Sequence, residues 1–299
     1  MKLKKGIAIA FIFVLLSMTL FISYSKELKN LPTTVLYFLT SNFQPERKQT
    51  LQIDFIDLYI SKLTKTTNHF KKKEKKESVS VVDKIVYNTL EPIVYIYNTH
   101  TNEEYSYKKN DIYNIVPTVK TASYILEEEL KKLGISSIVE PENTTNIIND
   151  KKMSYSESYT ISKKLLQNKQ KEYKSLTYFI DVHRDSVKRE ITTTTINGVT
   201  YARVMFLLGL ENPNYPENKK VLTVLNDYLN KNYKGLSRGI YEKQGKGVNG
   251  VYNQDISSNV LVIEVGGVDN TIEEVNNSLK IIANCLFNYI NDSKTTKKE

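Results

Sequence analysis

The chain has 299 residues, with 42 lysine and arginine residues against 33 aspartate and glutamate residues, a formal net charge of +9. Much of the excess lies in three basic segments, residues 2–5, 71–76 and 294–298, which favours contact with anionic surfaces over a nucleic-acid groove. We expect no nucleic-acid partner. The sole cysteine, Cys285, excludes an internal disulfide, and its place on an apolar helical face indicates a small core residue.

The N-terminal segment predicts a membrane anchor. Residues 6–23 contain no charge and approach the ~20 residues that span a bilayer, and three lysines precede them. The alternative is a signal peptide, but residues 21–25 offer only a poor cleavage site. We expect an uncleaved single-pass anchor in the cell membrane, with the cationic end inside and the rest of the chain outside the cytoplasm.

The remainder divides into a spacer, a folded domain and a tail. Residues 26–90 have weak periodicity and include a charged run at 71–77 that cannot be buried, so they form an extracytoplasmic spacer. Residues 91–292 are long enough for one α/β domain with a sizeable core. Residues 293–299 form a flexible tail.

Strand and helix patterns alternate along the folded domain. Helices are expected at 117–133, 154–168, 217–231 and 271–291, and strands at 93–98, 135–139, 176–182, 191–195, 201–210, 240–243 and 260–265. This alternation predicts a central sheet, mostly parallel or mixed, between layers of helices.

Three of the predicted strands end at side chains that can do chemistry. The first stops before His100 and Glu103, the one at 176–182 ends at His183, and the one at 260–265 includes Glu264. The carboxyl ends of strands are where ligands bind in open α/β sheets. Two neutral imidazoles and one carboxylate form an open zinc site, so we predict His100, Glu103 and His183 as ligands of Zn²⁺.

Zinc polarises a carbonyl oxygen and lowers the pKa of bound water toward ~7, so an amide can be attacked at neutral pH. A proton carrier is also needed. Glu264, followed by a Gly266-Gly267 pair expected to be flexible, is the candidate catalytic residue.

Each of these residues has an ordinary structural alternative, because a strand-end histidine is often a hydrogen-bonded residue and a lone glutamate is often a cap or ion-pair member. The combination favours a metal site, since the chain has only three histidines and the third, His69, lies in the spacer. Two other classes of function remain open: a carboxypeptidase-like zinc peptidase, and a module that binds the same substrate or recruits partners without catalysis.

Four motifs in order resemble the stage II sporulation protein P family. They are Thr99-His-Thr-Asn-Glu103, Ile180-Asp-Val-His-Arg-Asp-Ser186, Tyr252-Asn-Gln-Asp255 and Val262-Ile-Glu-Val-Gly-Gly267, behind an N-terminal apolar segment. The resemblance covers roughly residues 90–292. It implies a membrane-anchored peptidoglycan hydrolase with a three-layer α/β fold similar to the zinc N-acetylmuramoyl-L-alanine amidases, with His100, Glu103 and His183 on zinc and Glu264 in catalysis.

The resemblance also implies a substrate and a setting. The enzyme would cut the amide between N-acetylmuramic acid and L-alanine, and also peptide cross-links, during engulfment in sporulation, beside the stage II sporulation proteins D and M. Arg184 is expected either to bind a substrate carboxylate or sugar oxygen or to pair with Asp185.

Three amide side chains complete the predicted substrate contacts. Asn253 and Gln254 either orient the glycopeptide or cap a turn. Asn98 stands where many relatives carry a histidine, which leaves its contribution to substrate binding or to support of the ligands open.

Overall fold

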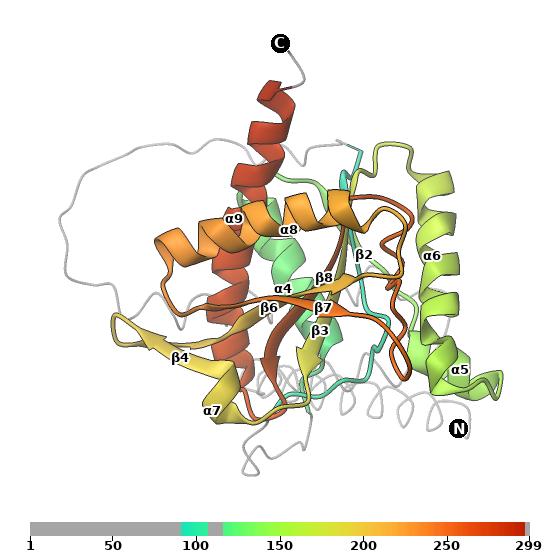
Figure 1. Ribbon diagram of the computed structural model, residues 1–299, viewed down its shortest axis with the longest axis horizontal. Coiled ribbons are helices and arrows are strands. Elements are labelled where there is room, and N and C mark those ends of the chain that lie inside the picture. The colour runs from blue at the N-terminus through green and yellow to red at the C-terminus, as the bar shows by residue number, and fades with distance from the viewer. Residues whose placement is uncertain (1–90, 107–115, 297–299) are drawn as a thin grey trace, which may run out of the picture. The chain divides into compact units, whose positions relative to one another are not determined.

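The structure is a computed structural model that describes residues 91–106 and 116–296 (Figure 1). The predicted anchor and spacer, residues 1–25 and 26–90, lie outside the described residues. Across the two described ranges, none of the helices has both the length and the apolar character needed to span a bilayer.

The described chain folds around one six-stranded sheet with the order β2-β1-β3-β8-β6-β7. Strands β1, β2, β3 and β8 are parallel, β6 is antiparallel to β8, and β7 is parallel to β6, so the expected mixed sheet is confirmed. The strands are β1 Val94–Tyr97, β2 Ser137–Val139, β3 Tyr178–Asp185, β6 Val204–Gly209, β7 Ser237–Lys243 and β8 Val260–Gly267. The carboxyl ends of β1, β3 and β8 therefore share one edge with the amino ends of β6 and β7.

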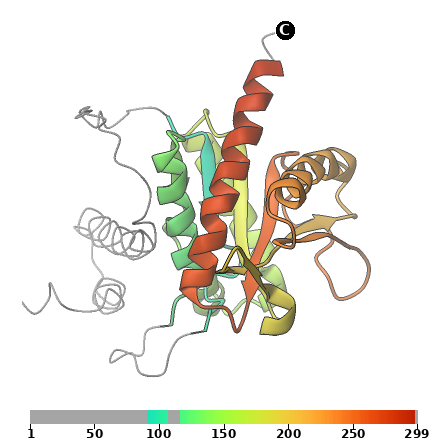
Figure 2. The same cartoon turned by 90° about the vertical axis from the view of Figure 1, so that its left-hand side faces the viewer.

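Helices cover both faces of the sheet. Helix α9 (Ile272–Thr296) lies between α4 (Val119–Lys132) and α8 (Tyr215–Asn232) on one face (Figure 2). Helix α6 (Ser158–Glu172), preceded by α5 (Thr144–Asp150) and the short 3-10 helix η2 (Tyr155–Glu157), lies on the other. The expectation of a sheet between two helical layers is thus confirmed.

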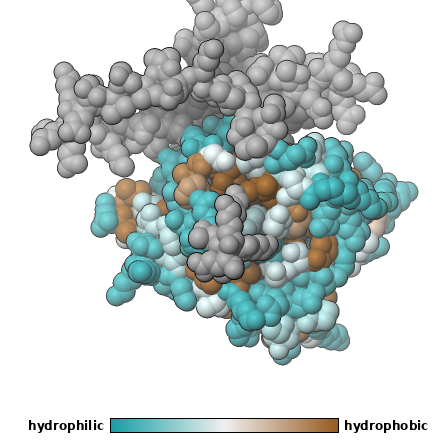
Figure 3. Space-filling view, turned by 90° about the horizontal axis from the view of Figure 1, so that it is seen from above, coloured by the Kyte–Doolittle hydropathy of each residue, from teal (hydrophilic) through white to brown (hydrophobic). Residues whose placement is uncertain are grey.

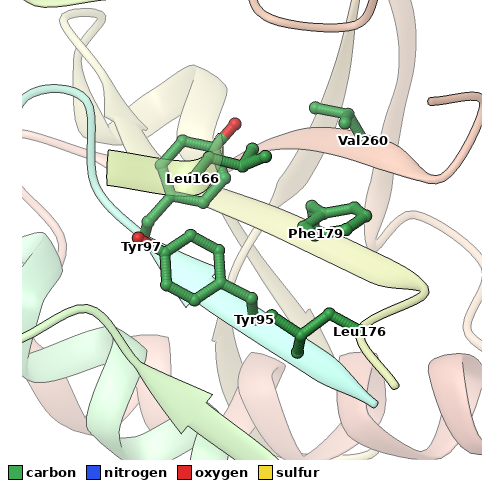
Figure 4. Close-up of a cluster of buried hydrophobic side chains, with 6 residues drawn as sticks. All are labelled: Tyr95, Tyr97, Leu166, Leu176, Phe179 and Val260. Carbon is green, nitrogen blue, oxygen red and sulfur yellow. The ribbon is translucent and has the colours of Figure 1, made fainter. Parts of the chain in front are cut away.

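Tyrosines form much of the core under α6. Leu166 of this helix packs on the side chains of Tyr95, Tyr97 and Phe179, and the Tyr95 and Tyr97 rings stack with centroids 5.4 Å apart (Figure 4). On the opposite face, Phe206 and Ile263 of the sheet lie against aliphatic side chains of α8 and α9. Cys285 of α9 belongs to the same group and is buried, as predicted. Figure 3 views the end of the molecule away from the carboxyl edge, where a group of apolar residues is visible near the centre of a mostly hydrophilic surface.

Most predicted elements are present, but several boundaries differ. The predicted strand at 191–195 is partly wrong, because residues 189–192 form the one-turn helix α7 (Arg189–Thr192) before β4 (Thr193–Ile196). The predicted strand at 201–210 is interrupted at Arg203, which separates β5 (Val199–Ala202) from β6. Strands β4 and β5 form a separate hairpin whose Asn197-Gly198 turn has positive φ at both residues, as a tight two-residue turn requires.

Two further expectations at the end of the domain are corrected. Gly266 and Gly267 are not a flexible pair but part of β8. A Cβ at Gly267 would lie 2.4 Å from the carbonyl oxygen of Val187, so the glycine lets the segment after β3 approach the end of β8. Helix α9 continues to Thr296, so the first residues of the predicted tail are helical.

Candidate functional site

Residues from three strands meet at the carboxyl edge of the sheet, which lies at the bottom in Figure 1, where α7 follows β3. His100 and Glu103 occupy the turn after β1, which is closed by a hydrogen bond from the Glu103 N–H to the His100 carbonyl at 3.1 Å. His183 lies inside β3 rather than at its end, and it pairs in register with Glu264 of β8. The structure therefore brings the four predicted residues to one edge.

His183 is 4% exposed and lies between two carboxylates. Its Nδ1 is 3.4 Å from Glu103 Oε2, and its Nε2 is 2.9 Å from Asp181 Oδ1. Within the described part of the chain, Nε2 makes no hydrogen bond, so its contact with Asp181 is an ion pair. Burial lowers the pKa of His183, but the Asp181 and Glu103 carboxylates outweigh it and hold the pKa well above its usual value. Without a metal, the imidazolium itself provides the positive charge between these two acids.

His100 contacts aromatic rings on several sides. Its ring centroid is 5.3 Å from that of His183 in an edge-on arrangement, and 4.3 Å from that of Tyr155 in a near-parallel stack. Burial lowers the pKa of His100 to about 4, and the charge on His183 adds to the effect. The ring is therefore neutral at pH 7, and its buried Nδ1 has no hydrogen-bond partner among residues 91–106 and 116–296.

The two glutamates have opposite electrostatic environments. Burial raises the pKa of Glu103, but His183 and the Arg184 backbone N–H, which donates to Oε2 at 3.0 Å, bring it below its usual value. Burial raises the pKa of Glu264 to about 7; His183 opposes this shift, and the charges of Glu103 and Asp185 add to it. Glu264 Oε2 is buried and has no hydrogen-bond partner in the described part of the chain, so this carboxyl group can hold a proton near neutral pH.

The residues fit a zinc ion by type and by proximity. Two imidazoles and one carboxylate are the donor set of an open zinc site, and the unpartnered Nδ1 of His100 is a nitrogen available to a cation. Their alignment is less complete: among residues 91–106 and 116–296, no three His, Cys, Asp or Glu side chains are arranged as a group that could hold a metal ion. Binding would thus require the side chains to reorient.

The rim of the site differs from the prediction at Arg184 and Asp185. The alternative of an ion pair between these neighbours is wrong, because Asp185 Oδ2 accepts from Arg238 Nη1 at 2.7 Å. Arg238 is at the amino end of β7. Because β6 and β7 run antiparallel to β8, their amino ends lie at this edge of the sheet. Arg184 donates from Nε to the Glu104 carbonyl at 2.9 Å.

The three predicted amide contacts are buried inside the protein. Gln254 is 0% exposed and bonds the β6 backbone through both ends of its amide, accepting from the Gly209 N–H and donating to the Leu207 carbonyl, each at 2.8 Å. Asn253 donates to Ser162 Oγ at 3.0 Å, and Asn98 donates to the Val182 carbonyl at 2.7 Å. These side chains are buried away from substrate in this structure. Asn253 and Gln254 bond α6 and β6 and do not cap a turn, and Asn98 bonds the strand next to His183.

Two residues next to the predicted ligands were not predicted as part of the site. Asp181 precedes His183 by two positions, so strand alternation places both on one face, and this period was a usable signal. Tyr155 stacks on His100 from the helical layer while remaining 65% exposed, and no local pattern indicates that contact.

The fold and site together define a mixed α/β protein with two histidines and several carboxylates clustered at the carboxyl edge of its sheet. The profile of the family described as Stage II sporulation protein P matches residues 23–287, so this chain belongs to that family.

One curated relative, Stage II sporulation protein P of Bacillus subtilis (strain 168), is 35% identical over 189 residues, which cover 61% of this chain and 47% of the relative. The chain thus matches about half of that relative's length.

Two solved structures have a distant similarity to the chain. The CwlD amidase from Clostridioides difficile, in complex with the GerS lipoprotein, is 10% identical with a TM-score of 0.42, over 68% of this chain and 98% of that chain. Cwp6 from Clostridium difficile is 13% identical with a TM-score of 0.41, over 67% and 29% respectively.

Proposed function

We propose that this protein is a zinc-dependent peptidoglycan hydrolase that cleaves the amide between N-acetylmuramic acid and L-alanine during sporulation. The single observation that supports this best is the meeting of His100, Glu103, His183 and Glu264 at one edge of the sheet, with buried, unpartnered atoms on His100 and Glu264. Membership of the stage II sporulation protein P family supports the sporulation setting. Peptide cross-links are a second proposed substrate.

The proposed setting is the outer side of the membrane. An N-terminal anchor at residues 1–25 would hold the catalytic domain against peptidoglycan, and the stage II sporulation proteins D and M are the proposed partners. The basis is the uncharged run at 6–23, flanked by lysines, together with the family membership.

In this mechanism, His100, Glu103 and His183 would hold the ion, which would supply Lewis-acid chemistry toward an amide carbonyl and water. The residues of the chain do the rest. Glu264 accepts a proton from the water and returns it to the leaving nitrogen, a task that suits a carboxyl group with a pKa of about 7. Arg184 lies beside Glu103 and Glu104, where its guanidinium can bind an anionic or sugar oxygen of the substrate.

The test combines metal analysis with product analysis on the full chain. We expect the purified wild type to contain about one zinc per chain and to release muropeptides with a free amino group on L-alanine, identified by mass spectrometry. His100→Ala should lose both metal and activity, whereas Glu264→Gln should keep the metal and lose activity. Cleavage only within the peptide would instead indicate a carboxypeptidase-like enzyme, and full function of Glu264→Gln would indicate a binding module.

A further inference from the structure

A β-bulge in β7 places Arg238 at the carboxyl edge. Arg238 and Gly239 lie together opposite one residue of β6, Met205. Gly239 has φ of +92°, a conformation that glycine adopts without strain. Bulges bend a strand and change the direction of a side chain, and they are frequent next to active sites. Here the side chain of Arg238 reaches Asp185 at the end of β3, although β8 and β6 lie between the two strands.

Arg238 uses only part of its hydrogen-bonding capacity within the protein. Its Nη1 donates to Asp185 Oδ2 at 2.7 Å, and its side chain is 13% exposed. Within residues 91–106 and 116–296, its Nε and Nη2 make no hydrogen bond and reach solvent. Because a guanidinium has five N–H donors in a fixed fork, these two nitrogens remain available to a ligand.

Arg203 is a contrasting arginine at the same edge. Its Nε, Nη1 and Nη2 each donate to a backbone carbonyl, those of Gly235, Ile191 and Ser237. Burial lowers the pKa of Arg203, and the nearby charge of Arg238 adds to the effect. In the described part of the chain, the two guanidinium groups hydrogen-bond one carboxylate between them, that of Asp185, so positive charge is in excess here.

The ion pair of Arg238 and Asp185 lies beside the proposed catalytic residue. Asp185 is close enough to Glu264 for its charge to raise the pKa of that carboxyl group. Each oxygen of Asp185 already accepts a hydrogen bond, Oδ1 from the Val187 N–H at 3.2 Å and Oδ2 from Arg238. A ligand at this point therefore meets the free nitrogens of Arg238, and a carboxylate fits them best because it can accept two parallel N–H bonds from one guanidinium.

We propose that Arg238 binds a carboxylate in the peptide part of the substrate and is a specificity-determining residue of the hydrolase. The inference rests on the proposed function, in which the substrate is a muramoyl peptide. The lactyl carboxyl group of the sugar is consumed in the scissile amide, so the free carboxylates of such a substrate belong to its peptide. The bulge at Gly239 and the contact with Asp185 hold the guanidinium in place before the substrate arrives.

The test compares two synthetic muramoyl peptides, one with all peptide carboxyl groups free and one with these groups converted to carboxamides. We expect the KM of the wild-type full chain to be about 10- to 100-fold lower for the acid form, the range that a hydrogen-bonded charge pair provides. Arg238→Gln should remove this preference by raising the KM for the acid form. A purely structural role of the ion pair would change the KM for both forms alike.

Two conservative changes form a matched pair. Arg238→Lys keeps the charge but not the planar fork, so it should retain only part of the preference for the acid form. Arg203→Lys loses the fork that bonds three carbonyls, so Tm should fall while the ratio of the two KM values stays within about twofold of wild type.

Circular dichroism and Tm identify any variant that fails to fold. Arg238→Met, which keeps the aliphatic part of the side chain, replaces Arg238→Gln in that case, with the same expected loss of preference. A wild-type preference for the acid form in a folded Arg238→Gln or Arg238→Met variant overturns the proposal.

Calorimetric binding of the same two compounds separates this inference from the proposed function. It is measured with Glu264→Gln, in which we expect hydrolysis to be lost. If the acid form binds more tightly but the wild type does not cleave the muramoyl amide, the proposed function fails and the role of Arg238 stands. If the wild type cleaves both forms with equal KM, the function stands and the role of Arg238 fails.

Discussion

The two faces of the sheet are built from the same strands but have opposite chemistry. In β3, Ile180 and Val182 are on the face covered by α4, while Asp181 and His183 are on the α6 side. In β8, Ile263 contacts α8 and α9, while Glu264 lies beside His183 on the other face.

The difference teaches how the protein separates stability from chemistry. The α4, α8 and α9 side buries mainly aliphatic side chains against the sheet, so its contribution to the fold comes chiefly from apolar burial. The α6 side buries ionisable groups, whose pairing depends on exact neighbours. We therefore expect substitutions on the α6 side near the carboxyl edge to change activity, and substitutions on the opposite side to change stability.

The largest expected effect is on the α6 side, at Glu264. Glu264→Gln keeps the size of the side chain and removes the group that accepts the proton, so kcat for muropeptide release should fall by roughly 10²- to 10⁴-fold. Tm should change little, since Oε2 makes no hydrogen bond to any residue that the structure describes. A large drop in Tm with unchanged kcat would reverse the roles of the two faces.

The matched change on the opposite face is Leu286→Ala. Leu286 of α9 is 1% exposed and lies against Phe206 and Ile263. Truncation should lower the free energy of unfolding by ~2–5 kcal/mol, measured by denaturant titration, because it leaves a cavity in the core. The folded fraction should retain wild-type kcat and KM, and a loss of kcat without loss of stability would contradict the comparison.

A buried lysine provides a pH test of stability away from the site. Lys120 of α4 is 8% exposed and donates to the Glu140 and Glu142 carbonyls, and burial lowers its pKa from 10.5 to about 8, although nearby glutamates oppose the shift. Between these two values the unfolded chain binds more protons than the folded one, so stability should rise with pH from about 8 toward 10.

Denaturant titrations at pH 8 and pH 10 measure this effect, which is at most a few kcal/mol. Lys120→Met is the control, and its stability should depend less on pH over the same interval. Identical pH profiles for the two proteins would show that Lys120 does not lose its proton more easily in the folded state.

The smallest expected effect is at Tyr155, whose ring stacks on His100 and is open to solvent. Aromatic contacts contribute ~0.5–1.5 kcal/mol, so Tyr155→Ala should raise KM by about 3- to 10-fold. Tyr155→Phe keeps the ring and should restore KM to near the wild-type value. If Tyr155→Phe is as impaired as Tyr155→Ala, the hydroxyl rather than the ring makes the contact.

Local patterns predicted much of this fold because the strands are short apolar runs and the helices have clear ends. Pro117 before α4 and Gly134 after it, the latter with φ of +77°, define that helix from the sequence alone. The α5 helix was missed, since its seven residues are mostly polar and its start depends on Asn143, whose side chain accepts from the Asn146 N–H.

What the amino-acid sequence determined by itself is the set of donors and the strands that carry them: His100 and Glu103 follow one strand, His183 was expected at the end of a second, and Glu264 belongs to a third. Only the tertiary structure decided that Arg238 pairs with Asp185 and that Gln254 hydrogen-bonds the backbone of β6. It also decided that Asp181 accepts a hydrogen bond from Thr99 and forms an ion pair with His183. The physical reason is that strand order and direction bring distant segments together, and a single sequence has no local signal for which strands become neighbours.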